Sequence, residues 1–322
     1  MKLIIQIPCY NEENTLPQVI ADLPKSLPGI DVIETQVIDD GSTDYTVKVA
    51  KELRVDHVIE LGKNKGLAVA FKSGVNNALD LDADYLVNTD GDNQYQGKDI
   101  IKLMETAMSE KADLVVGCRP IKNHPEFSFF KKRLQYFGSW VLRKVSGTSI
   151  KDAASGFRVY SRNAMLHLNI YSDFSYCMET LIQLGVENMT IIGVDIGVNP
   201  KTRKSRLFSS VLQYLWRQSK TIVSIFLLYR TNVLFGFSAL LTFIVSFVLA
   251  IRYFILILFS SAPASNFWPT IILAGVLLII SVLLYITGIL ASLLVANRKL
   301  SEEVLYRLRK NNANQNREEY HT

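Results

Sequence analysis

The chain has 322 residues, of which 49% are hydrophobic, and a formal net charge of +5 at pH 7. With three cysteines, 17 glycines and nine prolines, its composition excludes a collagen, a disulfide scaffold and a fully disordered chain. Residues 1–200 carry a net charge of −5, residues 201–230 carry +7 without any acidic side chain, and residues 231–322 carry +3. This asymmetry predicts an acidic globular domain followed by a basic stretch that meets an anionic surface.

The N-terminal segment MKLIIQIPCYNEE has too few apolar residues before Pro8 to act as a signal peptide, so no cleavage is expected. The cysteines at positions 9, 118 and 177 are scattered, and the four histidines are isolated. We therefore expect reduced cysteines that serve in packing, and no zinc site.

Short β-branched runs alternate with segments of helical length in the first part of the chain. The predicted strands are Leu3–Ile7, Thr35–Ile38, His57–Leu61, Tyr85–Asn88 and Asp113–Val116, with helices near 43–53, 66–80 and 98–110. This alternation predicts an α/β fold with a doubly wound, mostly parallel sheet. Ligands of such sheets bind beyond the carboxyl ends of the strands, where polar loops follow at 8–13, 39–44, 62–66, 90–94 and 117–120.

The loop that begins at Asp39 reads DDGSTD and leads into a predicted helix. Capping of that helix needs only one of its polar residues. The adjacent acids are explained by hydrogen bonds to a nucleotide base or ribose. No GxGxxG or GxxxxGK[ST] motif lies near these strands, so neither a dinucleotide cradle nor a P-loop is predicted.

The loop Asp90-Gly91-Asp92-Asn93-Gln94 puts two carboxylates and a carboxamide on one turn. Mg²⁺ or Mn²⁺ held by one or two carboxylates usually takes its other ligands from substrate phosphates and water. Aspartate and glycine favour any turn, but this one predicts a metal site for a nucleotide diphosphate. An EF-hand is excluded, because the glycine and glutamate that it requires are missing.

Two later segments mix basic and apolar residues. Phe127–Lys144 fits equally a helix with one face on the core and an interfacial helix that dips toward lipid. Residues 207–230 precede a membrane span, and we expect a basic amphipathic juxtamembrane helix there.

Val233–Ile251 and Ile271–Ala296 are apolar runs long enough to cross a bilayer. They predict a hairpin of two transmembrane helices, at about 233–255 and 270–296 within a membrane region 231–297. Basic residues flank only its outer ends, so the positive-inside rule places residues 1–230 and the tail 298–322 in the cytoplasm. Arg252 lies near one end of its run and is interpreted as snorkelling. The polar segment 309–322 is expected to be disordered.

Five motifs, in order and spacing, resemble the family 2 glycosyltransferases of GT-A fold, and more narrowly the polyprenyl-phosphate glycosyltransferases. The motifs are Pro8-Cys9-Tyr10-Asn11-Glu12, Asp39-Asp40-Gly41-Ser42, Asn64-Lys65-Gly66, Asp90-Gly91-Asp92-Asn93-Gln94 and Ser155-Gly156-Phe157-Arg158. The likeness covers about residues 1–210, and the two-span tail is similar to the membrane-anchored branch.

The resemblance implies a cytoplasmic GT-A domain over residues 1–206 that uses Mg²⁺ or Mn²⁺. It implies inverting transfer of one sugar from a nucleotide-diphosphate sugar, with a UDP-sugar favoured, to a polyprenyl phosphate such as undecaprenyl phosphate. The protein is then a multi-pass protein of the cell membrane with both termini in the cytoplasm. No nucleic-acid partner is expected, and the spans permit a homo-oligomer.

The resemblance also implies roles for individual residues. Nucleotide contacts are implied for Pro8, Tyr10, Asn11, Glu12, Ile38, Asp40, Asn64, Asp90, Gly91 and Gln94, and metal binding for Asp90 and Asp92. Catalytic roles are implied for Asp92, Arg119 and Arg158, and acceptor-phosphate contacts for Arg119, Ser155 and Arg158. Arg203 and Arg206 are implied in a loop that covers the donor.

Two assignments stay open. The chain departs from the family pattern before Ser205, so Lys201, Arg203 or Lys204 takes the place of an arginine that members carry there. Glu179 supports the site either by orienting the sugar or by pairing with a basic loop residue.

The alternative function is extension of a lipid-linked glycan or polysaccharide at a hydroxyl acceptor. Processive synthases of that kind carry a QxxRW signature, whereas residues 213–217 read QYLWR, with the last two residues inverted. A third hypothesis, an inactive scaffold, is opposed by the presence of both Asp90 and Asp92.

Overall fold

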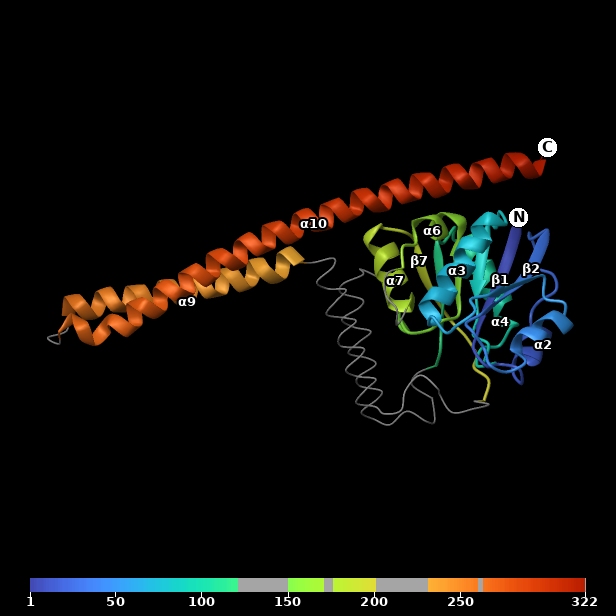
Figure 1. Ribbon diagram of the computed structural model, residues 1–322, viewed down its shortest axis with the longest axis horizontal. Coiled ribbons are helices and arrows are strands. Elements are labelled where there is room, and N and C mark those ends of the chain that lie inside the picture. Colours follow the sequence, from blue (N-terminus) through green and yellow to red (C-terminus); the bar gives the residue numbers. More distant parts are fainter. Residues whose placement is uncertain (121–149, 171–175, 201–230, 260–262, 322) are drawn as a thin grey trace. The chain divides into compact units, whose positions relative to one another are not determined.

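The computed structural model describes residues 1–120, 150–170, 176–200, 231–259 and 263–321 (Figure 1). The chain divides into two units, one of Met1–Leu207 with Leu305–Thr322 and the other of Phe208–Val304. The segments predicted as amphipathic, Phe127–Lys144 and 207–230, lie outside the described residues.

A sheet of seven strands, as far as the chain is described, lies at the centre of the first unit (Figure 1). The strands are β1 (Lys2–Cys9), β2 (Val32–Asp39), β3 (His57–Glu60), β4 (Tyr85–Asn88), β5 (Leu114–Cys118), β6 (Arg158–Ser161) and β7 (Ile191–Asp195). Their order is β3-β2-β1-β4-β6-β5-β7, and β6 alone among them is antiparallel to its neighbours. The predicted α/β sheet is therefore confirmed, and its five predicted strands correspond to β1–β5.

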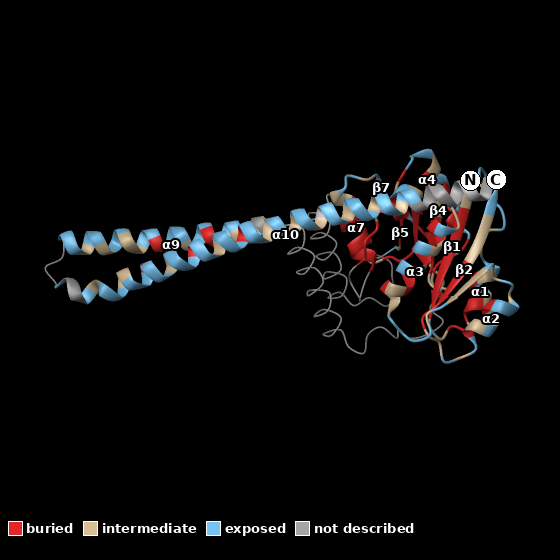
Figure 2. Ribbon diagram, turned by 45° about the horizontal axis from the view of Figure 1, so that its top comes forward, coloured by how far each residue is buried: buried red, intermediate tan, exposed pale blue. Residues whose placement is uncertain are grey.

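Helices cover both faces of the sheet, and the strands between them are buried (Figure 2). One face carries α1 (Leu16–Ala21), α2 (Thr46–Glu52) and α4 (Asp99–Ser109), and the other carries α3 (Leu67–Asp80), α6 (Arg162–His167) and α7 (Tyr176–Val186). Alternate residues of β1 serve the two layers, because Ile5 and Ile7 pack toward α4 and α1 whereas Gln6 approaches Gly74 of α3. The sequence predicted α2, α3 and α4 but not α1, α6 and α7.

The antiparallel strand β6 determines where the SGFR motif lies. Its first residue, Arg158, pairs with Asn88 of β4 and with Val116 of β5. An antiparallel strand begins at the edge where its parallel neighbours end. The loop that precedes β6 therefore lies at the carboxyl edge of the sheet, where ligands of such folds bind.

Three buried carboxamides form a chain of hydrogen bonds across the sheet near this edge. Gln36 Nε2 donates to Gly74 O at 2.8 Å and to Gln6 Oε1 at 3.2 Å, and Gln6 Nε2 donates to Asn88 Oδ1 at 2.7 Å. Asn88 Nδ2 in turn donates to Gly156 O at 2.8 Å. Because buried polar groups are costly unless bonded, this chain fixes β2, β1 and β4 to one another and to the loop before β6.

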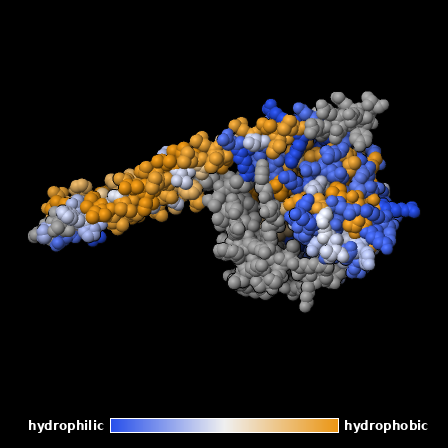
Figure 3. Space-filling model, viewed as in Figure 1, coloured by the Kyte–Doolittle hydropathy of each residue, from blue (hydrophilic) through white to orange (hydrophobic). Residues whose placement is uncertain are grey.

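The second unit contains a helical hairpin of α9 (Thr231–Phe259) and α10 (Trp268–His321), the latter continuing into the first unit. Both helices are long and apolar enough to cross a membrane, and 11% and 17% of their most apolar windows are buried, so they are unlike core helices of a soluble protein (Figure 3). Ser246 Oγ donates to Ala274 O at 2.7 Å, and Ser281 Oγ donates to Ala239 O at 2.8 Å. These reciprocal bonds join the two helices at small residues, as in membrane helix pairs.

The expectation that residues 309–322 are disordered is wrong, because α10 continues to His321. Its later part belongs to the first unit, where Arg309 Nη1 donates to the carbonyls of Leu166 at 3.3 Å and Leu168 at 2.6 Å. The Tyr306 ring lies 4.1 Å from the His167 ring. A cation that satisfies carbonyls at the end of a helix stabilises it, and composition alone does not reveal that contact.

Replacing Gln6 with leucine tests the carboxamide chain. The change leaves Asn88 Oδ1 without its donor and removes the acceptor of one Gln36 bond, at a cost of about 1–3 kcal/mol for each group left unsatisfied. We expect the melting temperature of the full-length protein in detergent to fall by about 5–10 °C. The exposed Gln18→Leu is the matched control, with a shift below about 2 °C. Equal melting of Gln6→Leu and wild type would show that the chain adds no stability.

Candidate active site

The loops after β1 and β2 form one continuous surface at the carboxyl edge. Asp40 N–H donates to Cys9 O at 2.9 Å, and Asn11 N–H donates to Ser42 Oγ at 2.9 Å. The Asn11 side chain returns a bond by accepting from Thr43 N–H at 2.7 Å. The backbone of Asn11 is left-handed, with φ 57°, a conformation that asparagine tolerates. Two of the predicted nucleotide-binding motifs are thereby joined.

The Asp40 carboxylate ties the second loop to the third. Its oxygens accept from the N–H groups of Lys65 at 2.7 Å and Gly66 at 2.9 Å. The loops approach so closely that a Cβ on Gly41, where φ is +74°, would lie 2.6 Å from Asn64 N. Asp40 is buried, but each carboxylate oxygen accepts more than one bond, so its contact with a nucleotide stays a prediction.

The Asp90-Gly91-Asp92 turn packs directly on the loop after β1. A Cβ on Gly91 would lie 3.1 Å from Cys9 Sγ and 3.2 Å from Glu12 Cγ, so Glu12 lies beside the turn. Burial, the neighbouring Asp92 and the more distant Glu12 raise the pKa of Asp90 to about 7, against the opposing effect of the Arg119 cation. The charges of Asp92 and Glu12 thus both disfavour the ionised form of Asp90.

The pair Asp90 and Asp92 fits a divalent cation that arrives with a diphosphate. In the described part of the chain, no group of three or more histidine, cysteine or acidic side chains is arranged to hold a metal ion. Two carboxylates nevertheless suffice for Mg²⁺ or Mn²⁺ when phosphates and water complete the shell. Burial is the largest cause of the raised pKa of Asp90, followed by the charge of Asp92, and a bound cation would oppose both effects.

Asn199, which the sequence reasoning missed, holds the far side of this turn. Its N–H donates to Gln94 O at 2.9 Å, and its Nδ2 donates to Asn93 O at 3.1 Å. Gln94 N–H donates to Asp92 Oδ1 at 3.1 Å, so the turn is also bonded internally. The signal available was the place of Asn199 just before the basic residues of the predicted donor-covering loop.

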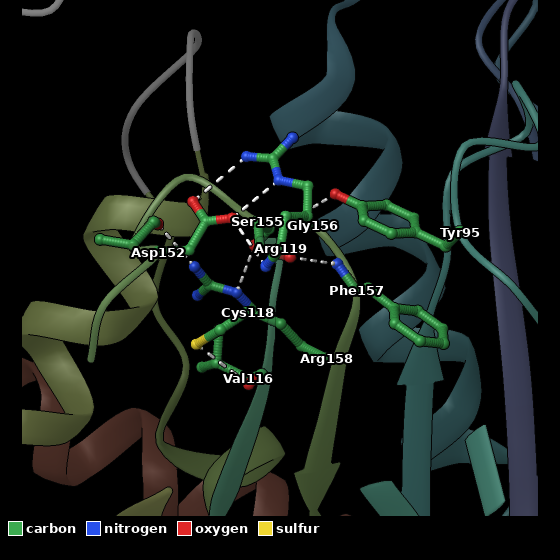
Figure 4. A network of polar contacts seen from close by, with 10 residues as sticks. Tyr95, Val116, Cys118, Arg119, Asp152, Ser155, Gly156, Phe157 and Arg158 are labelled. Atoms are coloured by element: carbon green, nitrogen blue, oxygen red, sulfur yellow. Dashed lines mark hydrogen bonds and ion pairs between the residues drawn. The ribbon is translucent and has the colours of Figure 1, made fainter. Parts of the chain in front are cut away.

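Arg119, at the end of β5, forms a bidentate ion pair with Asp152, another residue that the sequence reasoning missed (Figure 4). Arg119 Nε lies 2.7 Å from Asp152 Oδ2 and Nη2 lies 3.2 Å from Oδ1, while Arg119 N–H donates to Oδ2 at 3.3 Å. The Asp152 side chain is fully buried and that of Arg119 is 17% exposed. Arg119 lowers the pKa of Asp90, and Asp90 raises the pKa of Arg119, so the two charges attract each other at the carboxyl edge of the sheet.

Arg158 was predicted to be catalytic and to contact the acceptor phosphate, and both roles stay predictions. Arg158 has no exposed surface, and its Nε donates to Ser155 O at 2.7 Å. Its Nη1 donates to Cys177 O at 2.7 Å and to Thr180 Oγ1 at 2.9 Å, and its Nη2 donates to Ala153 O at 2.8 Å. The guanidinium is thus occupied by protein acceptors and holds the loop before β6.

Ser155 is also buried without exposed surface, and its predicted contact with the acceptor phosphate stays a prediction. Its Oγ accepts from Phe157 N–H at 3.4 Å (Figure 4). The neighbouring Gly156 donates its N–H to the Tyr95 hydroxyl at 3.1 Å, and a Cβ there would lie 3.0 Å from Asp90 Oδ1. The SGFR segment therefore packs against the turn Asp90-Gly91-Asp92, which we call the metal turn.

The structure gives the positions of several further predicted site residues but does not test their contacts with substrate. Glu179 is buried on α7, Pro8 and Ile38 lie within β1 and β2, and Tyr10 and Asn64 are exposed in their loops. Their proposed contacts stay predictions. Lys201, Arg203, Lys204 and Arg206 lie outside the described residues. Cys9, Cys118 and Cys177 are free and buried, as the sequence predicted.

The sequence model of the family described as "Glycosyl transferase family 2" matches residues 4–168, about half of the chain. A UDP-N-acetylglucosamine–dolichyl-phosphate N-acetylglucosaminyltransferase of Methanococcus voltae is 30% identical over 198 residues, which cover 55% of this chain and 77% of the relative. An undecaprenyl-phosphate 4-deoxy-4-formamido-L-arabinose transferase of Proteus mirabilis is 32% identical over 182 residues, which cover 54% of each protein. This chain therefore spans about half of the second relative.

The glucosyl-3-phosphoglycerate synthase of Mycobacterium tuberculosis is a similar solved structure. It superposes with a TM-score of 0.52 at 20% sequence identity, covering 69% of this chain and 77% of that one. A likeness at this identity concerns the fold, and it agrees with the mixed sheet described above.

The raised pKa of Asp90 predicts a stability gain in Asp90→Asn that depends on pH. The wild-type carboxyl favours the folded state while protonated, so its contribution is present below its ordinary pKa of 3.8 and is lost as the pH rises through about 7. The amide stays neutral at every pH. In EDTA at pH 8 we expect Asp90→Asn to melt about 5 °C above wild type, with the gain shrinking toward pH 5. Mn²⁺ should stabilise only the wild type, and a variant that melts lower at pH 8 would refute the carboxylate repulsion.

Replacing Arg158 with methionine distinguishes its structural role from contact with phosphate. The change leaves several buried acceptors without a donor, so we expect a loss of about 3 kcal/mol or more and a fall in melting temperature of about 10 °C. Differential scanning fluorimetry of the full-length protein measures it, with the exposed Arg54→Met as control. Loss of activity in an Arg158→Met variant that melts like wild type would instead support direct contact with substrate.

Proposed function

The chain belongs to glycosyl transferase family 2 and is a glycosyltransferase, and we propose that it transfers one sugar from a nucleotide-diphosphate sugar to a polyprenyl phosphate. The observation that carries the proposal is that the Asp90–Asp92 turn follows β4 and Arg119 follows β5 at one edge of the sheet, where the loop before β6 contacts both. An acidic pair suits a cation with its diphosphate, and a guanidinium suits the oxygens of a phosphate. One edge of the sheet thus offers complementary groups to both substrates.

The names of the relatives support a lipid phosphate as the acceptor. The Methanococcus voltae protein is named for transfer to dolichyl phosphate, and the Proteus mirabilis protein for undecaprenyl phosphate. A polyprenyl chain stays in the bilayer, so an enzyme that uses it needs a membrane attachment. The apolar helices α9 and α10 meet that need. The first relative's name also supports a UDP-linked donor.

The reaction needs no general base from the protein. A phosphate monoester has a second pKa of about 6, so its oxygens are anionic at neutral pH. One oxygen attacks the anomeric carbon while the bond from that carbon to the β-phosphate oxygen of the donor breaks. The bonding electron pair leaves with the nucleoside diphosphate, and attack from the opposite side inverts the anomeric configuration.

The residues at the edge have separate tasks in this proposal. Asp90 and Asp92 would hold a divalent cation, which neutralises charge on the departing diphosphate. Arg119 provides N–H groups for phosphate oxygens. Tyr10, which is 38% exposed, and Asn64 provide exposed groups for the base and ribose.

The distribution of charge supports a cytoplasmic site. The stretch 201–230 has seven basic residues and no acidic one, and Arg298 and Lys299 follow the second apolar run. Basic residues collect on the cytoplasmic side of membrane spans and are attracted to anionic lipids. We place residues 1–230 and 298–322 on that side.

A transfer assay tests the function. Membranes that contain the protein are incubated with labelled UDP-sugars, undecaprenyl phosphate and Mn²⁺, and we expect a monosaccharide lipid that mild acid cleaves. A glycan of several sugars would instead indicate a hydroxyl acceptor, and no transfer from any nucleotide sugar would refute the proposal. Thermal stabilisation by a panel of nucleotide sugars identifies the donor, because a ligand that binds only the folded state raises its stability.

The change Asp92→Asn tests the role of the metal turn in turnover. Loss of one cation ligand should lower the transfer rate by about 100-fold or more, the scale expected when a group that stabilises developing charge is removed. The rate is measured as lipid-linked sugar formed at saturating Mn²⁺. Asp80→Asn, at the end of α3 remote from the site, is the control. Wild-type turnover in Asp92→Asn would exclude metal-assisted departure at this turn.

A further inference from the structure

In the described residues, Arg119 is the hydrogen-bond partner of the Asp152 carboxylate. Within the described part of the chain, its side chain bonds only to Arg119, through both guanidinium nitrogens Nε and Nη2 and through the backbone N–H. It has no exposed surface, so no substrate reaches it. Any effect of Asp152 on the substrate therefore passes through Arg119.

The geometry of the pair leaves one side of the guanidinium available. A guanidinium carries five N–H groups in a fixed plane, and Asp152 takes the edge formed by Nε and one hydrogen of Nη2. Figure 4 shows the third nitrogen, Nη1, turned away from Asp152. No described residue bonds to Nη1, and the Arg119 side chain keeps 17% of its surface exposed.

We propose that Asp152 is a positioning residue, which grips Arg119 by one edge of its guanidinium so that the opposite edge meets a phosphate of the substrate. The inference rests on the proposed function, because it assumes that the site receives phosphates. Asp90 also attracts the same cation, but the guanidinium is bonded to Asp152.

Orientation explains this pair better than stability does. The desolvation of two charges offsets much of their attraction, so a buried ion pair contributes little compared with apolar residues of the same size. A bidentate contact, in contrast, fixes the plane and the direction of a guanidinium. That direction matters only if another group has to meet the remaining edge.

Arg158 fixes the loop that carries Asp152. Arg158 donates to the carbonyls of Ala153 at 2.8 Å and Ser155 at 2.7 Å, which follow Asp152 in the same loop. Gly156 of that loop lies against Asp90. One rigid loop thus sets both the arginine and the metal turn, and the distance between them follows from its backbone.

The test is a double-mutant cycle in the full-length protein, assayed in detergent with undecaprenyl phosphate and the donor that the wild type uses. We expect Asp152→Asn to lower kcat/KM by about 10- to 100-fold, the range for outer partners that orient a ligand. The double variant Asp152→Asn/Arg119→Met should be no worse than Arg119→Met alone, because Asp152 then has nothing to position. A purely structural role would lower kcat/KM further in the double variant and would overturn the inference.

Two further measurements separate the sources of phosphate. A higher KM for undecaprenyl phosphate with unchanged affinity for UDP and Mn²⁺ assigns the free edge to the acceptor. Weaker binding of UDP and Mn²⁺, measured by calorimetry, assigns it to the donor diphosphate. Either result supports the positioning role, whereas Asp152→Asn with wild-type kinetics and wild-type UDP binding overturns it.

The same set of variants also controls for a folding defect. If Asp152→Asn does not fold, the comparison between Arg119→Met and the double variant still decides, because the double variant leaves no unpaired charge. Failure of the wild type to make a lipid-linked sugar with any donor counts against the proposed function. An active wild type that is matched by a folded Asp152→Asn counts only against this inference.

Discussion

The crowding of negative charge at one edge of the sheet is the constraint on which this site depends. Glu12, Asp90 and Asp92 are held close by backbone contacts that leave little room for them to separate, as the glycine at position 91 shows. Both proposed substrates add phosphate to this edge. Positive charges therefore have to be held at defined positions near this edge. The fold offers Arg119, which Asp152 restrains, and a turn that suits a divalent ion.

The reversed strand β6 makes this arrangement possible. A wholly parallel sheet would send the segment that precedes β6 to the opposite edge, far from Asp90. Reversal instead brings the loop from Asp152 to Phe157 against the metal turn and buries Arg158 beneath it. The arginine of the SGFR motif thus holds a loop of the site, and Arg119 is the arginine for which we propose a contact with phosphate.

The sequence predicted the first five strands and their loops because β-branched runs and polar turns are local signals. It missed β6 because its four residues, Arg-Val-Tyr-Ser, begin with a charge and are too short to show a pattern. The protein partners of Arg158 were not predicted, since a motif does not reveal that its acceptors come from α7 as well as from its own loop. Asp152 escaped notice because its partner lies 33 positions earlier in the chain. Likewise, the order of the C-terminal segment depends on carbonyls near residue 167, which composition does not encode.

The carboxamide chain near the site bears on how the fold responds to pH. Gln36, Gln6 and Asn88 have no ionisable group, so the foundation of the edge stays electrically neutral from acid to alkaline conditions. The side chains that join these strands therefore carry no charge that a proton could alter. The charge of the ionisable side chains at the carboxyl edge can therefore change during turnover, while the hydrogen bonds of the carboxamide chain that supports them stay the same.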